Sequence, residues 1–143
     1  MVLAEKAERL LQSLLDALSD LERYRQSVTR EVLRADRDTQ NMVLHALYVA
    51  IQSAIDLAFH AVADAGLPRP ATYQDAFRRL SEGGRLEPEL AERLAGWAGL
   101  RNVLAHFYPV IDFDKVHQAL RDGLADLRTF ARTMAALVPP AGP

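Results

Sequence analysis

The chain has 143 residues, of which 50% are hydrophobic and 25% charged, with a formal net charge of -2 at pH 7. This balance is typical of one globular domain and excludes a disordered chain, and the negative charge argues against broad electrostatic binding of nucleic acid. The absence of cysteine excludes disulfides, thiolate metal sites and thiol nucleophiles. Charged residues near the start and the lack of a long apolar run predict a cytoplasmic protein without membrane contact.

The first half of the chain shows helical periodicity throughout. Apolar residues recur at helical spacing and no long stretch alternates with period two, so the sequence predicts an all-α fold. We expect an amphipathic helix over about 3–25, a short helix over 28–35 and a long helix over about 39–65. Asp36 and Asp38 are candidate N-caps for the long helix. Its wide apolar surface predicts that it lies at the centre of the fold.

The second half contains clear start and stop signals. Thr72 predicts the N-cap of a short helix, and Pro88 suits the first turn of the next one. Pro109 ends that helix, because a proline disfavours helical geometry in the residue before it. Asp112 or Asp114 begins a last helix.

Taken together, these elements predict one domain over residues 1–143. The expected fold is an antiparallel helical bundle of about five to six helices, with a long central helix and a loose tail over 137–143. We find no internal repeat or linker.

Four hydrogen-bonding side chains interrupt an otherwise apolar stretch near the end of the helix that begins at Pro88. They are Arg101, Asn102, His106 and Tyr108. Arg101 continues the apolar stripe of its helix, so its guanidinium needs an acceptor or an anion there. Asp56 interrupts the apolar surface of the long helix and is the expected partner. The alternative is that Arg101 only forms a structural ion pair.

These residue types suit metal-free RNA cleavage. The imidazole of His106 can exchange a proton near neutral pH, and the guanidinium of Arg101 can hold a phosphate and stabilise its developing charge. Asn102 can orient the imidazole or donate to the phosphate. The sequence has neither a histidine pair four residues apart with a glutamate nor a glycine-rich phosphate loop, so we expect no metal and no cofactor.

Two glycines flank the single tryptophan of the same helix. Gly96 and Gly99 each cost about 1 kcal/mol of helix stability relative to alanine, which favours a close helix approach as their reason. Self-association and packing on the long helix explain such an approach equally well.

The stretch Arg101-Asn102-Val103-Leu104-Ala105-His106-Phe107-Tyr108 resembles the signature of the HEPN superfamily. That signature has an arginine, an adjacent polar residue, an interval of four to six positions, a histidine, any residue and a tyrosine. The chain resembles in particular the HepT-like toxins of HepT/MntA-type pairs. The likeness extends to residues 50–56, 70–77 and 111–112 and covers roughly residues 5 to 135.

The resemblance implies an α-helical homodimer whose motif helices meet in a cleft. Arg101 and His106 of both subunits would form a metal-independent endoribonuclease site, as in a type VII-like toxin–antitoxin system. It also implies a nucleotidyltransferase antitoxin that attaches AMP to Tyr108 and silences the nuclease. Added adenylate would bring negative charge and bulk to the place that the RNA backbone must occupy.

Two other functions remain open. The chain can be a non-catalytic helical adaptor that binds a nucleotidyltransferase, with the same polar residues as a docking surface. It can also be an oligomerising bundle in which the motif is a buried polar network.

Overall fold

The computed structural model describes residues 2–106 and 111–137. Over these residues the chain is all-α with no strand, which confirms the predicted fold class. The described part contains seven helices: α1 (Val2–Ser27), α2 (Arg30–Ala35), α3 (Arg37–Asp64), α4 (Tyr73–Glu82), α5 (Pro88–His106), α6 (Phe113–Asp122) and α7 (Leu124–Leu137).

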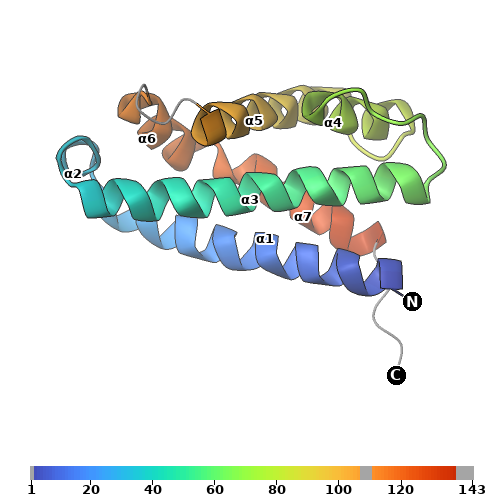
Figure 1. Cartoon of the computed structure of the whole chain (residues 1–143), viewed down its shortest axis with the longest axis horizontal. Coiled ribbons are helices and arrows are strands. Elements are labelled where there is room, and N and C mark those ends of the chain that lie inside the picture. Colours follow the sequence, from blue (N-terminus) through green and yellow to red (C-terminus); the bar gives the residue numbers. More distant parts are fainter. Residues whose placement is uncertain (1, 107–110, 138–143) are drawn as a thin grey trace.

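The long helix α3 lies between the other layers of the fold. In Figure 1, α1 runs antiparallel to α3 on one side, and α4 and α5 lie along the other. α7 passes behind α3 in this view and packs against both α1 and α5, whereas α2 and α6 close one end. The predicted central position of the long helix is therefore correct, and it brings the motif helix α5 alongside α3.

Local capping residues set the helix ends. Asp36 caps α3 by accepting from the backbone N–H of Thr39, and Thr72 caps α4 by accepting from the backbone N–H of Asp75. Gly66 follows α3 with a φ of 68° and closes a Schellman motif, a turn that suits glycine. Of the two candidate caps for the helix after the motif, Asp112 is the one used.

One continuous hydrophobic core joins the layers. The α3 residues Leu47, Ile51 and Ile55 are almost fully buried, and the rings of Phe77 and Phe130 meet edge to face at 5.4 Å between α4 and α7. α3 is long and apolar enough to cross a membrane by length and composition alone, but 61% of its most apolar window is buried inside the protein. A core helix accounts for this apolar surface.

The last helix predicted from the sequence is two helices. α6 ends at Asp122 and α7 begins at Leu124, with Gly123 between them. A Cβ at Gly123 would lie 2.4 Å from Cζ2 of Trp97, so the tryptophan of α5 occupies the space that a side chain would need. The break between α6 and α7 therefore lies where the Trp97 ring packs closely against Gly123, and helical periodicity alone does not reveal this contact.

The two glycines beside Trp97 differ in their surroundings. A Cβ at Gly99 would lie 3.9 Å from the Gln74 side chain, whereas a Cβ at Gly96 would meet no atom within 4 Å. Packing within the described part of the chain therefore gives no reason for Gly96, and of the two explanations only self-association stays open for it.

Candidate active site around Arg101

The Arg101 side chain lies between α5, α3 and α4. Its Nε donates to Oε1 of Gln52 at 2.7 Å, and Nη1 makes a long contact of 3.4 Å with Oδ1 of Asn102. The guanidinium carbon lies 5.0 Å from the ring centre of Tyr73 and 5.6 Å from that of Tyr48, within the range of cation–π attraction. Two polar contacts and two aromatic rings thus fix one orientation of a half-buried cation.

Asp56 reaches Arg101 through Gln52. The Gln52 Nε2 donates to Oδ1 of Asp56 at 2.9 Å, so the amide accepts from the arginine at one end and donates to the carboxylate at the other. Among the described residues no ion pair involves Arg101, and the direct contact with Asp56 expected from the sequence is not formed. The Asp56 carboxylate instead orients the Gln52 amide, and this amide in turn orients the Arg101 guanidinium.

His106 lies on a different side of the same helix. It is the last residue of α5 and is exposed. Five residues separate it from Arg101, which is about 140° around an α-helix. Within one chain the structure therefore holds Arg101 against α3 and α4 and leaves His106 on the outside. Tyr108 lies outside the described residues.

Sequence reasoning named Asp56 but missed three side chains that surround the arginine: Tyr48, Gln52 and Tyr73. Tyr48, Gln52 and Asp56 are each four residues apart on α3, so they share one face of that helix. This spacing of polar groups on an apolar helix was the available signal for Tyr48 and Gln52. Tyr73, at the first position of α4, comes next to Arg101 only through tertiary packing and has no comparable signal.

A hollow of about 230 Å³ lies beside the arginine, and we call it the α3–α5 hollow. Four residues of α3 and one of α5 line it: Asn41, Leu44, His45, Tyr48 and Leu104. The Tyr48 side chain therefore borders both the hollow and the surroundings of Arg101.

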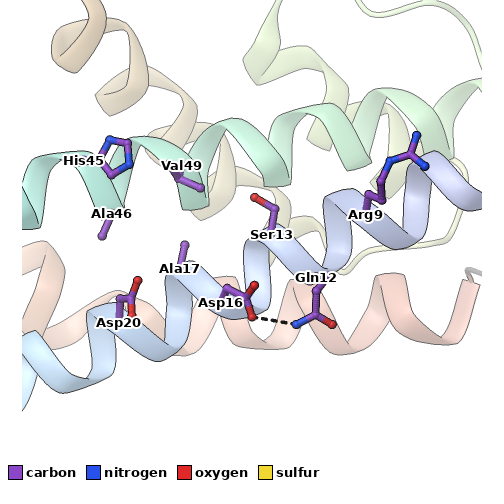
Figure 2. Close-up of a pocket in the computed structure, with 9 residues that line it drawn as sticks. All are labelled: Arg9, Gln12, Ser13, Asp16, Ala17, Asp20, His45, Ala46 and Val49. Carbon is purple, nitrogen blue, oxygen red and sulfur yellow. Dashed lines mark hydrogen bonds between the residues drawn. The ribbon is translucent and has the colours of Figure 1, made fainter.

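A second hollow of about 390 Å³, the α1–α3 hollow, opens on the other side of α3 (Figure 2). It contains none of the motif residues, and the amide of Gln12 donates to Asp16 at its edge. Among the described residues, His45 alone lines both hollows. The α1–α3 hollow is lined by Arg9, Gln12, Ser13, Asp16, Ala17, Asp20, His45, Ala46 and Val49.

An exposed ion pair joins the two short helices at one end of the fold. Arg34 of α2 donates to both carboxylate oxygens of Asp114 at 2.7 and 2.6 Å, which joins α2 to α6. The hydrogen bond from Arg34 holds the pKa of Asp114 below its usual value. Over residues 2–106 and 111–137 no three His, Asp or Glu side chains gather as a metal site would require. The charged or titratable groups that the described motif residues offer are the Arg101 guanidinium and the His106 imidazole, which lie on different sides of α5.

A family model described as "Ribonuclease HepT-like" matches residues 14–134, which is most of the chain. The chain belongs to the HepT-like ribonuclease family. The match includes α3, with its face of Tyr48, Gln52 and Asp56, and the whole of α5. The resemblance read from the motif, to the HEPN superfamily and its HepT-like branch, is confirmed.

Individual relatives of this HepT-like chain are similar to it in sequence or in fold. The tRNA nuclease HepT of Aphanizomenon flos-aquae is 34% identical over 86 residues, and the aligned part is 60% of this chain and 58% of that protein. The tri-AMPylated HEPN toxin of Shewanella oneidensis, in complex with the MNT antitoxin, superposes with a TM-score of 0.83 at 21% identity, over 92% and 97% of the two chains. YutE, a cytosolic protein of unknown function from Bacillus subtilis, superposes with a TM-score of 0.81 at 13% identity, over 93% and 88%.

Proposed function

We propose that this chain is a metal-independent endoribonuclease toxin of a toxin–antitoxin pair and that it acts in the cytoplasm. The observation that carries the proposal is the Arg101 guanidinium, oriented by Gln52 and two tyrosine rings on the helix that also carries His106. A cation that served only packing would need no such orientation, whereas a phosphate ligand benefits from a fixed set of N–H donors.

The proposed reaction is transfer of the phosphoryl group within RNA. The 2′-oxygen attacks the adjacent phosphorus, the bond from phosphorus to the 5′-oxygen breaks, and a 2′,3′-cyclic phosphate and a 5′-hydroxyl result. His106 accepts the proton of the 2′-hydroxyl or delivers one to the departing 5′-oxygen. Arg101 donates to the phosphoryl oxygens as charge builds on them, and Asn102 supports the guanidinium or the imidazole. Asp56 acts at a distance, through Gln52.

A homodimer would solve the geometric problem that one chain leaves. Arg101 and His106 point to different sides of α5, so one phosphate is more easily shared between the arginine of one subunit and the histidine of the other. The outer side of α5 has room for a second copy, since Gly96 has open space around it and Val103 is 36% exposed, and the shared site then requires that the half-buried Arg101 side chain also meets that copy. Small and apolar groups let two helices approach closely.

The proposed antitoxin is a nucleotidyltransferase that attaches AMP to Tyr108. The support is the position of the tyrosine, two residues after His106, and the family of the chain. The Shewanella oneidensis toxin is described as tri-AMPylated and in complex with its antitoxin. Adenylate groups beside Arg101 would compete with the RNA phosphate for the same cation.

The test is cleavage of RNA by the purified protein in the presence of a chelator. We expect products that end in 2′,3′-cyclic phosphate, and we expect His106→Ala to lower the rate by about 10²-fold to 10⁴-fold. Full activity of His106→Ala, or products without the cyclic phosphate, would reject the chemistry.

A second measurement tests regulation and the adaptor alternative. Intact mass of the chain co-produced with a nucleotidyltransferase should show added AMP, and Tyr108→Phe should abolish the addition. If the chain cleaves no RNA, leaves growth unaffected and loses its partner on Arg101→Ala, the adaptor function is correct instead.

A further inference from the structure

The α3–α5 hollow lies one aromatic ring away from the proposed phosphate site. Tyr48 faces the Arg101 guanidinium at 5.6 Å and also lines the hollow. Leu104, which lines it from α5, follows Arg101 by three residues and is therefore its neighbour on the helix surface. A group attached to a phosphate at Arg101 would therefore lie near Tyr48 and Leu104, the two residues that border this space on the side of the arginine.

The lining of the hollow is apolar at its base and polar at its edge. Leu44 and Leu104 are 3% and 7% exposed, Tyr48 is half-buried, and Asn41 and His45 are exposed. None of the five lining residues is a lysine, arginine, aspartate or glutamate. Such a lining suits a flat, uncharged group with apolar faces and a polar edge better than a second phosphate.

We propose that the α3–α5 hollow binds one unpaired nucleobase of the RNA, next to the phosphate that Arg101 holds. This inference rests on the proposed ribonuclease function. Proteins that read single-stranded RNA place unstacked bases against aromatic and apolar side chains and contact their polar edges with side chains at the rim. Here Tyr48 and the two leucines face the base, and His45 lies at its edge with Asn41.

The proposal makes the affinity for RNA depend on a base at one position. It also separates two tasks, because Arg101 holds a phosphate that every nucleotide carries, whereas the hollow needs the base itself. Loss of that base should weaken binding even though every phosphate is still present.

The experiment uses short single-stranded RNA in which every ribose carries a 2′-O-methyl group, so that the nucleophile is blocked and binding is measured without cleavage. Fluorescence anisotropy gives the Kd of the intact oligonucleotide and of versions with an abasic residue at each position in turn. We expect one abasic position to raise the Kd of the wild-type protein by about fivefold or more, as stacking of one base requires.

Substitutions at the rim of the hollow then connect this effect to the structure. Asn41→Leu and His45→Leu change exposed positions at the polar edge, and both should reduce the difference between the intact and the abasic oligonucleotide. The matched control is Gln12→Leu, an exposed polar residue of the α1–α3 hollow, which should keep the difference. Circular dichroism checks that all three variants fold.

The inference is overturned if no single abasic position matters, if the rim variants keep the difference, or if the wild-type protein does not bind the intact oligonucleotide. The ribonuclease proposal is tested separately on the same sequence with free 2′-hydroxyl groups. Cleavage of that RNA with no abasic effect would leave the proposed function standing and reject only the base site.

Discussion

The inner and outer sides of α5 are stabilised very differently. On the inner side Leu94 is fully buried, and Arg101 is held by Gln52 and two tyrosine rings. On the outer side Gly96 has no atom near its missing side chain, and His106 is exposed. One chain therefore determines where the guanidinium lies but leaves the imidazole facing away from the core.

This contrast separates stability from function along a single helix. The inner side must be correct for the chain to fold, and it carries the phosphate-binding group of the proposed site. The outer side contributes little to folding and is available for a second copy of the chain. Substitutions on the two sides should accordingly give different kinds of defect.

The largest stability effect should come from the inner side. Leu94→Ala should lower the free energy of unfolding by about 2–5 kcal/mol, because it leaves a cavity in the core. Val103→Ala, on the outer side of the same helix, should change it by no more than about 0.5 kcal/mol. Urea denaturation of both variants measures the difference, and equal losses would contradict the division of α5 into two sides.

A matched pair of glycines sharpens the comparison. Gly123→Ala should destabilise the protein by about 1–3 kcal/mol, because the new Cβ would meet the Trp97 ring at 2.4 Å. The Cβ added in Gly96→Ala would meet no atom within 4 Å, so this variant should stabilise the isolated chain by about 0.5–1 kcal/mol through helix propensity. Denaturation of both variants gives these values.

Sedimentation of the same Gly96→Ala variant tests the proposed dimer. If the outer side of α5 contacts a second copy, the added methyl groups should weaken dimerisation while the monomer gains stability. A dimer that is unchanged by the substitution would exclude Gly96 from the contact.

The next effect concerns the orientation of Arg101. Gln52→Ala removes the acceptor at 2.7 Å from Nε and should lower kcat/KM for RNA by about tenfold, because the guanidinium loses its fixed direction. Asp56→Asn should lose less activity than Asp56→Ala, since an amide oxygen still accepts from Gln52. Steady-state kinetics with thermal denaturation of each variant separates positioning from folding. Equal activity of wild type and Gln52→Ala would show that the amide is not needed.

The smallest effect is a pH dependence at the start of α3. The side-chain hydroxyl and backbone N–H of Thr39 donate to Asp36 and lower the pKa of this carboxyl. Its stabilising contribution is therefore complete above the unfolded pKa of about 3.9 and is lost as the pH falls through the lower folded value. Asp36→Asn keeps a capping side chain but cannot titrate, so wild type should lose stability relative to this variant in acid. Denaturation curves of both proteins from neutral to acid pH measure the difference in their free energies of unfolding. A difference that does not change with pH would refute this role of Asp36.

The sequence by itself determined the fold class and most helix ends. Caps such as Asp36 and Thr72 and the proline at position 88 act through backbone groups a few residues away, so local rules predicted them correctly. It also singled out Arg101 as a charge on an apolar stripe, because helical periodicity is a local property.

Only the tertiary structure decided what Arg101 contacts. Its acceptor Gln52 is 49 residues away, and Tyr73 reaches it by the packing of α4 on α5. The break at Gly123 has the same origin, because the Trp97 ring that needs the space comes from another helix. Periodicity and capping report which face of a helix is buried, whereas the partners on that face depend on how helices distant in sequence are packed together.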